Sequence, residues 1–207
     1  FTYSADLAEM PACDELVKKV LAEHETVDVL INNAGRSIRR SVALSYDRFH
    51  DFERTMGLNY FGSLRLIMGF LPSMTARRRG HIINISSIGV QASSPRFSAY
   101  VASKAALDAF SRCAQAEFSD QNITFTTINM PLVRTPMIGP TKIYDSMPLL
   151  KPEAPLVCSV PHPAFAMLDP TAPDPLRIVH AYDDSAPRTW ELDGRDVVTG
   201  AEGTEQV

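Results

Sequence analysis

The sequence has few cysteines, a single tryptophan and no long apolar run. Its three cysteines, Cys13, Cys113 and Cys158, are far apart, odd in number and not in Cys-x-x-Cys spacing. This pattern argues against a disulfide scaffold and a metal site, and it favours a reducing compartment, which we expect to be the cytoplasm. No apolar run reaches the about 18 residues of a membrane span, so we expect no integral membrane segment. Residues 1–30 also lack the pattern of a signal peptide.

The chain has two compositional regions. With 207 residues, 45% of them hydrophobic, it suits one ordinary domain with a core. Residues 1–150 carry 16 basic and 14 acidic side chains, whereas residues 151–207 carry 4 and 10 and most of the prolines. No basic patch suggests nucleic-acid binding. Residues 1–150 are therefore the expected domain, and residues 151–207 a Pro-rich acidic tail, poorly ordered or divergent.

Two interpretations of the tail remain open. It is either a natural disordered extension, or an altered reading frame or divergent end; the abrupt change in composition favours the second slightly. The prolines forbid a long helix in the tail. Residues 176–182 could still form a short strand.

The first region alternates β-branched runs with helical periodicity. The predicted strands are Phe1–Tyr3 (the end of a strand), Val27–Ile31, His81–Ile85 and Ile123–Ile128. The predicted helices start near Pro11, run from a Ser45 cap to about residue 75, and span residues 98–119. Arg77–Arg79 and Gly80 are expected to close the second helix. This helix carries an apolar stripe predicted to serve core or dimer packing: Phe49, Phe52, Met56, Tyr60, Leu64 and Ile67.

Alternating strands and helices predict a parallel sheet covered by helices on both faces. Ligands of such sheets bind beyond the carboxyl ends of the strands. Three loops follow predicted strands: Asn32–Gly35, Ser86–Gly89 and Met130–Thr135. We therefore expect these loops to meet at one edge and to line a single site.

A phenol and an ammonium lie four residues apart at Tyr100 and Lys104, on one face of the third predicted helix. A free tyrosine has a pKa near 10 and is a poor acid–base group at neutral pH. A nearby ammonium favours the phenolate, so we expect Lys104 to lower the pKa of Tyr100. Such pairs are common on protein surfaces, and only their context makes this one informative.

That context is a series of motifs in fixed order. They are Asp6-Leu7, Asn-Asn-Ala-Gly at 32–35, Asn59 in MGLNYFG, Ser87 in NISSIG, and YVASK at 100–104. Together they resemble the classical short-chain dehydrogenase/reductase family over about residues 1–150. The resemblance implies a Rossmann-like, doubly wound α/β fold and a homodimer or homotetramer.

The resemblance also implies roles. Tyr100 would protonate the substrate carbonyl, Ser87 would polarise it, Lys104 would bind the nicotinamide ribose, and Asn59 would hold a water behind Lys104. Donors at Ser87 and Tyr100 suit the negative charge that hydride transfer builds on oxygen. The cofactor, NADPH or alternatively NADH, would contact these residues: Asp6, Leu7, Asn32, Ala34, Gly35, Tyr100, Lys104, Pro131, Val133 and Thr135.

The segment from Asn129 to Tyr144 narrows the resemblance. The family usually has a Pro-Gly pair here, but this chain reads Asn-Met-Pro-Leu-Val and lacks the glycine. The continuation is similar to the substrate loop of bacterial fatty acyl-CoA reductases, which implies an acyl-CoA or fatty aldehyde substrate. Arg36, Arg39 and Arg40 would lie near the mouth of such a site. They are expected at the solvated surface, with a CoA-phosphate contact as the alternative.

The sequence departs from the family at its start. The Gly-rich turn that cradles the cofactor pyrophosphate is not found. We therefore expect a fragment that lacks the first two strands, with low stability and weak cofactor binding. Two alternatives stay open: a 3-ketoacyl, steroid or small-alcohol dehydrogenase of the same family, or a non-catalytic truncated product that acts only by binding.

Overall fold

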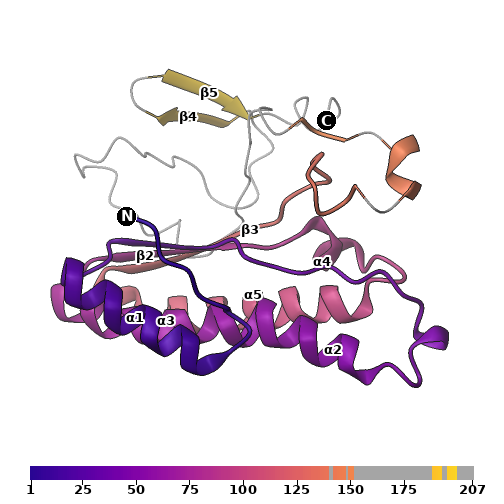
Figure 1. Ribbon diagram of the computed structural model, residues 1–207. Coiled ribbons are helices and arrows are strands. Elements are labelled where there is room, and N and C mark those ends of the chain that lie inside the picture. Colours follow the sequence, from indigo (N-terminus) through magenta and orange to yellow (C-terminus); the bar gives the residue numbers. More distant parts are fainter. Residues whose placement is uncertain (140–141, 148, 152–187, 193–194, 200–207) are drawn as a thin grey trace. The chain divides into compact units, whose positions relative to one another are not determined.

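The protein contains a three-stranded parallel sheet in its first part (Figure 1). The computed structural model describes residues 1–139, 142–147, 149–151, 188–192 and 195–199. The chain divides into two compact units, Phe1–Ala154 and Pro155–Val207. In the first unit, β1 (Val29–Asn32), β2 (Gly80–Ile85) and β3 (Ile123–Ile128) lie side by side in that order. The expected Rossmann-like α/β architecture is confirmed.

Three helices pack on one face of this sheet: α1 (Met10–His24), α3 (Ser63–Arg77) and α5 (Ser98–Phe118). Alternate residues of the strands face these helices, so Ile82 and Phe125 are buried in the core. On β1, Val29 and Ile31 are 49% and 57% exposed. Helix cover on both faces was expected, but within the described residues these helices cover one face only.

Helices α1 and α3 approach closely at a glycine. A Cβ atom on Gly69 would lie 2.6 Å from a methyl carbon of Val17, so a larger residue there would force the two helices apart.

Pro11 lies at the start of α1, where its missing N–H costs nothing. The predicted positions of α1 and α5 are therefore confirmed to within a few residues.

The predicted long helix is divided into three segments, and the middle one is a π-helix that the sequence did not predict. The segments are α2 (Phe49–Met56), the π-helical η2 (Gly57–Gly62) and α3. Ser45 does not cap this helix, because its hydroxyl donates to the carbonyl of Ser41 within the short turn η1 (Val42–Leu44). The helix starts at Phe49 instead.

The end and the buried face of this helix also differ from the prediction. Arg78 ends the helix in the left-handed conformation (φ 52°), and Gly80 is the first residue of β2. Phe49, placed on the packing stripe, is 70% exposed. The buried side of α2 carries Asp51 and Thr55, because the Asp51 carboxylate pairs with Arg40 and Arg48 and the Thr55 hydroxyl bonds to the Asp51 carbonyl.

The predicted strand at Phe1–Tyr3 is wrong. These residues form no strand, because no strand among the described residues pairs with their backbone. The segment is held instead through a side chain. The Tyr3 hydroxyl lies 2.6 Å from a carboxylate oxygen of Glu23 and 2.6 Å from Nε2 of His24.

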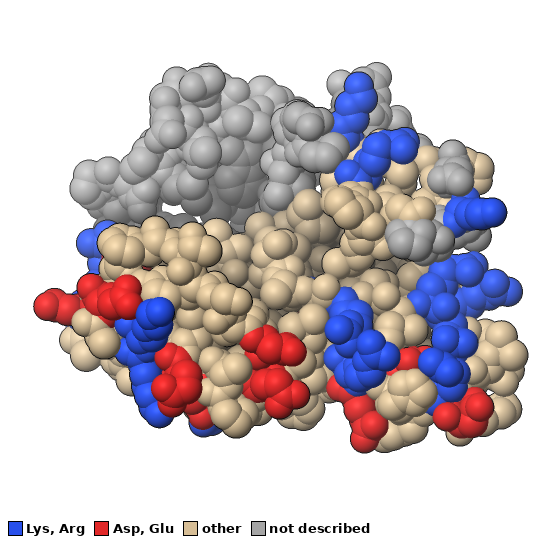
Figure 2. All heavy atoms as spheres, viewed as in Figure 1, with Lys and Arg blue, Asp and Glu red and all other residues tan. Residues whose placement is uncertain are grey.

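Short elements complete the description. They are α4 (Ile88–Ala92), η3 (Ser119–Gln121), η4 (Lys142–Ser146) and, in the second unit, the antiparallel pair β4 (Arg188–Leu192) and β5 (Arg195–Thr199). The predicted strand at residues 176–182 lies outside the described residues. No helix in the described part of the chain is long and apolar enough to cross a membrane. On the face seen in Figure 2, basic and acidic side chains are interspersed along the helices.

Candidate active site

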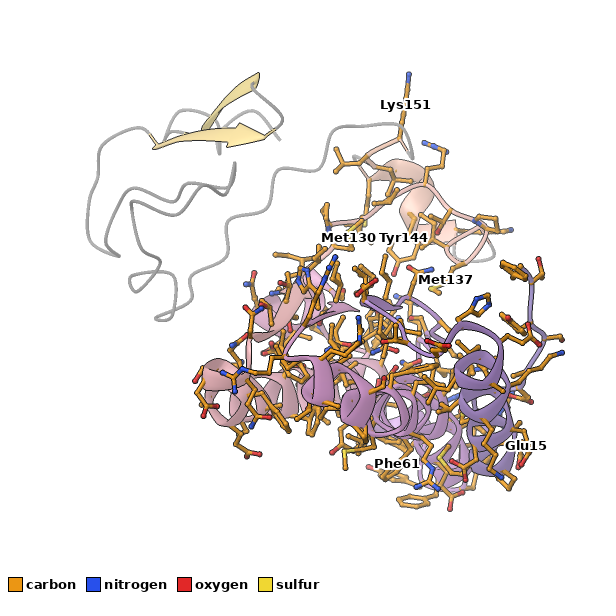
Figure 3. The ribbon with its side chains drawn as sticks, turned by 90° about the vertical axis from the view of Figure 1, so that its left-hand side faces the viewer. Glu15, Phe61, Met130, Met137, Tyr144 and Lys151 are labelled. Atoms are coloured by element: carbon orange, nitrogen blue, oxygen red, sulfur yellow. The ribbon has the colours of Figure 1, made fainter. Side chains whose placement is uncertain are left out.

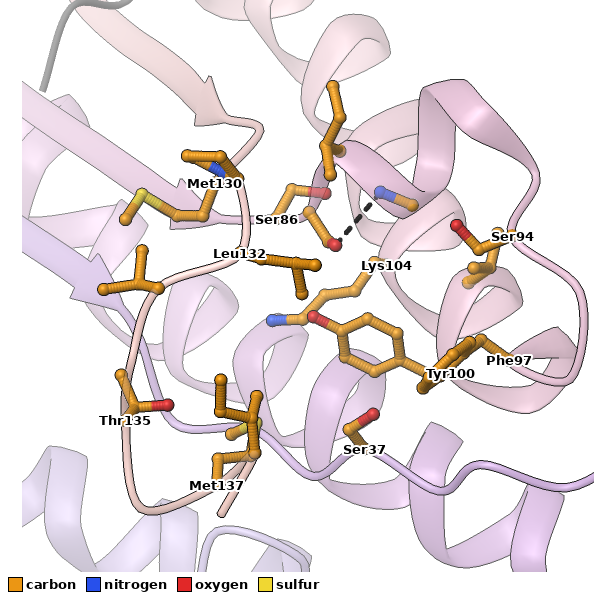
Figure 4. Close-up of a pocket in the computed structure, with 18 of the residues that line it drawn as sticks. Ser37, Ser86, Ser94, Phe97, Tyr100, Lys104, Met130, Leu132, Thr135 and Met137 are labelled. Atoms are coloured by element: carbon orange, nitrogen blue, oxygen red, sulfur yellow. Dashed lines mark hydrogen bonds between the residues drawn. The ribbon is translucent and has the colours of Figure 1, made fainter. Parts of the chain in front are cut away.

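A pocket of about 470 Å³ lies at the carboxyl ends of the strands (Figure 4). Its walls come from the loops that follow β1, β2 and β3, together with α5 and η4. Gly35 contributes from the first loop, Ser87 from the second and Thr135 from the third, while Tyr100 and Lys104 come from α5. The predicted meeting of the three strand-end loops at one site is therefore confirmed.

Lys104 lies on the floor of the pocket with its charge almost fully buried. The residue is 4% exposed, and its Nζ donates a hydrogen bond of 2.6 Å to the carbonyl of Ile85, the last residue of β2. Burial lowers the pKa of this amine to about 8. An ammonium has three donors. Two N–H groups therefore have no partner among the described residues and are available to a ligand.

Tyr100 lies one helical turn before Lys104 and reaches the same pocket (Figure 4). Burial raises the pKa of its phenol, and a hydrogen bond from the side chain of Ser87 opposes that effect. The lowering of this pKa by Lys104 stays a prediction, because burial and the Ser87 hydrogen bond are the effects identified on the phenol in the free protein. At neutral pH the phenol therefore keeps its proton.

Ser87 is fixed by the helix that follows it. It is the N-cap of α4, and its Oγ accepts a hydrogen bond of 3.1 Å from the amide of Gly89. This bond uses an acceptor site, so the one hydroxyl proton of Ser87 is free to be donated, and in the free protein it is directed at Tyr100. A carbonyl oxygen that took the place of this contact would meet two hydroxyl donors.

Asn59 lies behind the pocket, in the π-helical segment η2. It is completely buried, its Oδ1 accepts from the amide of Arg36 at 2.7 Å, and its Nδ2 donates to the Arg36 carbonyl and to Ser103 Oγ, both at 2.9 Å. A Cβ on Gly35 would lie 3.4 Å from both Asn59 Oδ1 and Lys104 Nζ. Asn59 therefore fixes the loop after β1 next to the lysine.

The residues predicted to bind the cofactor fall into two groups. Four of them line the pocket with Tyr100 and Lys104: Gly35, Pro131, Val133 and Thr135. The other four lie outside it: Asp6, Leu7, Asn32 and Ala34.

Three residues of the second group, Asp6, Leu7 and Asn32, have structural partners. Buried Asn32 donates from its Nδ2 to Asn84 Oδ1 at 2.8 Å and so joins β1 to β2. Asp6 accepts from the Ala8 amide, and Leu7 packs against the core with its carbonyl over Gly62.

Sequence reasoning missed Ser37 and Phe97, which line the pocket, whereas Met137 and Tyr144 belong to the segment that resembles a substrate loop. Phe97 precedes α5 by one residue, so its position one turn before Tyr100 was a usable signal. Figure 3 shows Tyr144 and Met137 at the same end of the unit as Met130, far from Phe61 and Glu15. The pocket also holds a buried hydroxyl, Ser86 Oγ, that has no hydrogen-bond partner among the described residues.

Comparison with protein families gives one match over most of the chain. The model of the short chain dehydrogenase family matches residues 1–143. A fatty acyl-CoA reductase of Acinetobacter baylyi is 63% identical over 151 residues, which are 73% of this chain and 51% of that protein. An uncharacterized oxidoreductase of Mycobacterium tuberculosis is 56% identical over 151 residues, 73% of this chain and 44% of its own. The chain thus spans about half the length of these relatives.

Solved structures share the fold. A short-chain dehydrogenase from Streptomyces avermitilis aligns with a TM-score of 0.61 and 35% identity, over 64% of this chain and 48% of that one. A metagenomic short-chain oxidoreductase in complex with NADP aligns with a TM-score of 0.59 and 27% identity, over 67% and 61%. An NAD+-bound xylitol dehydrogenase, at 24% identity, shows the same fold.

Proposed function

Since the chain belongs to the short-chain dehydrogenase family, we propose that it carries the catalytic residues of an oxidoreductase that reduces a carbonyl with NADPH, or alternatively with NADH. The proposed substrate is a fatty acyl-CoA or a fatty aldehyde. One observation carries the proposal: Ser87, Tyr100 and Lys104 meet in a single pocket at the strand ends. A relative named fatty acyl-CoA reductase, 63% identical, supports the substrate class.

The donors and acceptors of the pocket fit a nicotinamide nucleotide. The two free N–H groups of Lys104 suit ribose hydroxyls, and the unpartnered Ser86 Oγ offers a further polar contact. Thr135 lines the same pocket and would bind the carboxamide. When bound, the nucleotide supplies the hydride.

The protein's own residues handle the proton and the carbonyl oxygen. Ser87 donates its hydroxyl hydrogen to that oxygen and orients it. Tyr100 donates a second hydrogen bond and transfers its proton as negative charge grows on the oxygen. The raised pKa of Tyr100 keeps this proton in place at neutral pH. Asn59 holds the loop at Arg36 against the floor of the pocket and thereby positions Lys104.

The pocket offers an apolar wall for a chain-like substrate. Its apolar side chains include Ile88, Phe97, Leu132, Met137 and Ile138. Burial of such a chain contributes about 0.8 kcal/mol per methylene. A long acyl group would therefore gain affinity here that a small alcohol would not.

The substitution Tyr100→Phe tests the proposal, because it removes one oxygen and little volume. We expect turnover of an acyl-CoA or aldehyde to fall roughly 10²–10⁴-fold, while NADPH still binds in a fluorescence titration. Tyr46→Phe, at a residue 86% exposed and outside the pocket, is the matched control and should leave turnover unchanged. Undiminished turnover in Tyr100→Phe would refute the proposed role, and release of free CoA would separate acyl-CoA reduction from the reduction of other carbonyls.

A further inference from the structure

The charges around the pocket are all of one sign. Two cationic side chains line it, Lys104 on the floor and Arg39 in the loop after β1, and none of its lining residues is an aspartate or glutamate. Lys104 is buried and bound to the Ile85 carbonyl. Arg39 is exposed, so it contributes a positive charge where the pocket opens to solvent.

The neighbouring arginines differ from Arg39 in their partners. The Arg40 guanidinium is bound to the buried carboxylate of Asp51 at 3.0 Å, and the backbone of Arg36 is held by Asn59. Arg39 forms no ion pair within the part of the chain that the structure describes. Of these three arginines, only Arg39 lines the pocket.

Tyr144, from η4, lines the same pocket as Arg39 and Tyr100. Burial raises the pKa of its phenol, and the positive charge of Arg39 opposes that effect, so these two side chains lie close enough to interact. A ligand held at the Ser87–Tyr100 centre therefore shares its pocket with a guanidinium that has no ion-pair partner among the described residues.

We infer that Arg39 and the Tyr144 hydroxyl form a subsite for the phosphate-bearing part of an acyl thioester, so that the pocket favours acyl-CoA over a free fatty aldehyde. The inference rests on the proposed function and narrows its substrate class. A guanidinium binds phosphate oxygens through two parallel N–H donors, a geometry that an uncharged aldehyde cannot use. The acyl chain of either substrate would still meet the apolar wall, so only the thioester gains from Arg39.

Equilibrium binding to the protein and its Arg39→Gln variant tests this inference, with dodecanoyl-CoA, dodecanal and NADPH as the probes. We expect Arg39→Gln to weaken dodecanoyl-CoA about tenfold, with dodecanal and NADPH unchanged. The loss should shrink as salt is raised, because ions screen an exposed charge. Arg54→Gln removes an exposed arginine outside the pocket and is the matched control, with no change expected.

Several results would overturn the inference. They are unchanged dodecanoyl-CoA binding in Arg39→Gln, equal weakening of dodecanal, weakening of NADPH alone, or a wild-type protein that binds dodecanoyl-CoA no better than dodecanal. Weakening of NADPH alone would assign Arg39 to a cofactor phosphate. If dodecanoyl-CoA binds through Arg39 but no CoA is released with NADPH, the proposed function fails and the subsite stands.

Discussion

A buried polar network and a pair of buried polar side chains at the strand ends differ in whether their donors and acceptors have partners. In the first, Asn32 donates to Asn84, Asn84 donates to Ser111, and Ser111 donates to the Leu107 carbonyl, at 2.7–2.8 Å throughout. All three side chains are at most 5% exposed. This network joins β1, β2 and α5 and leaves little for a ligand to bind.

The pair at the strand ends, Lys104 and Ser86, leaves hydrogen-bonding groups without partners. Lys104 uses one of its three donors, and Ser86 Oγ has no partner among the described residues. A buried polar group without a partner costs about 1–3 kcal/mol of stability. The difference teaches that the first network contributes stability, whereas the unpartnered groups at the strand ends cost stability in the free protein, a cost that the proposed nucleotide would offset on binding.

Asn84→Leu should give the largest effect on stability. The change leaves the Asn32 amide without its acceptor in a buried site, so we expect unfolding to become easier by about 3 kcal/mol. Chemical denaturation measures this loss. The double variant Asn32→Leu/Asn84→Leu removes both partners and should recover much of it. No loss in the single variant would contradict the assigned role.

Lys104→Met tests the pair at the strand ends, where we expect affinity rather than stability to be lost. Methionine fills the space of the lysine stem and removes a buried charge, so the melting temperature should hold or rise. NADPH affinity should fall about tenfold to a hundredfold, since hydrogen bonds from a charged group contribute roughly 1.5–3 kcal/mol. A fluorescence titration measures the affinity. If Lys104→Met lost stability as well as affinity, Lys104 would contribute to stability as Asn84 does, and the contrast would fail.

A pH titration should give stability and NADPH affinity opposite trends. The pKa of Lys104 is about 8 in the folded protein and 10.5 normally, so the unfolded chain binds more protons between these values. Stability should therefore rise from about pH 8 to 10.5, relative to Lys104→Met. NADPH affinity should fall over the same range as the ammonium loses its charge. Parallel rather than opposite trends would contradict the proposed role of Lys104.

The sequence predicted the parts of the molecule that depend on periodicity and strand order. Strand β3 and helix α5 were placed to within one residue, and the meeting of the three loops followed from the rule that ligands bind at strand ends. The position of Tyr100 and Lys104 beside Ser87 followed from the family resemblance. The buried face of α2 was missed, because an apolar stripe does not reveal that an aspartate will be buried by two arginines.

The remaining differences between prediction and structure depend on residues that are brought together only by the fold. The pKa of Tyr100 was predicted from the charge of its neighbour, but desolvation, which depends on the assembled pocket, has the larger effect. Asn32 was assigned to the cofactor, yet it lies beside Asn84, a partner 52 residues away that no local motif indicates.

The π-helical segment η2 constrains the number of residues between α2 and α3. A π turn holds one residue more than an α-helical turn, so deleting one residue from Gly57–Gly62 would restore α geometry. Because the π segment absorbs this extra residue, the deletion would leave α2 and α3 in line and would displace chiefly the segment itself. Asn59 lies in that segment, so its bonds to the backbone of Arg36 would be lost. The extra residue is thus what presents Asn59 to the loop after β1.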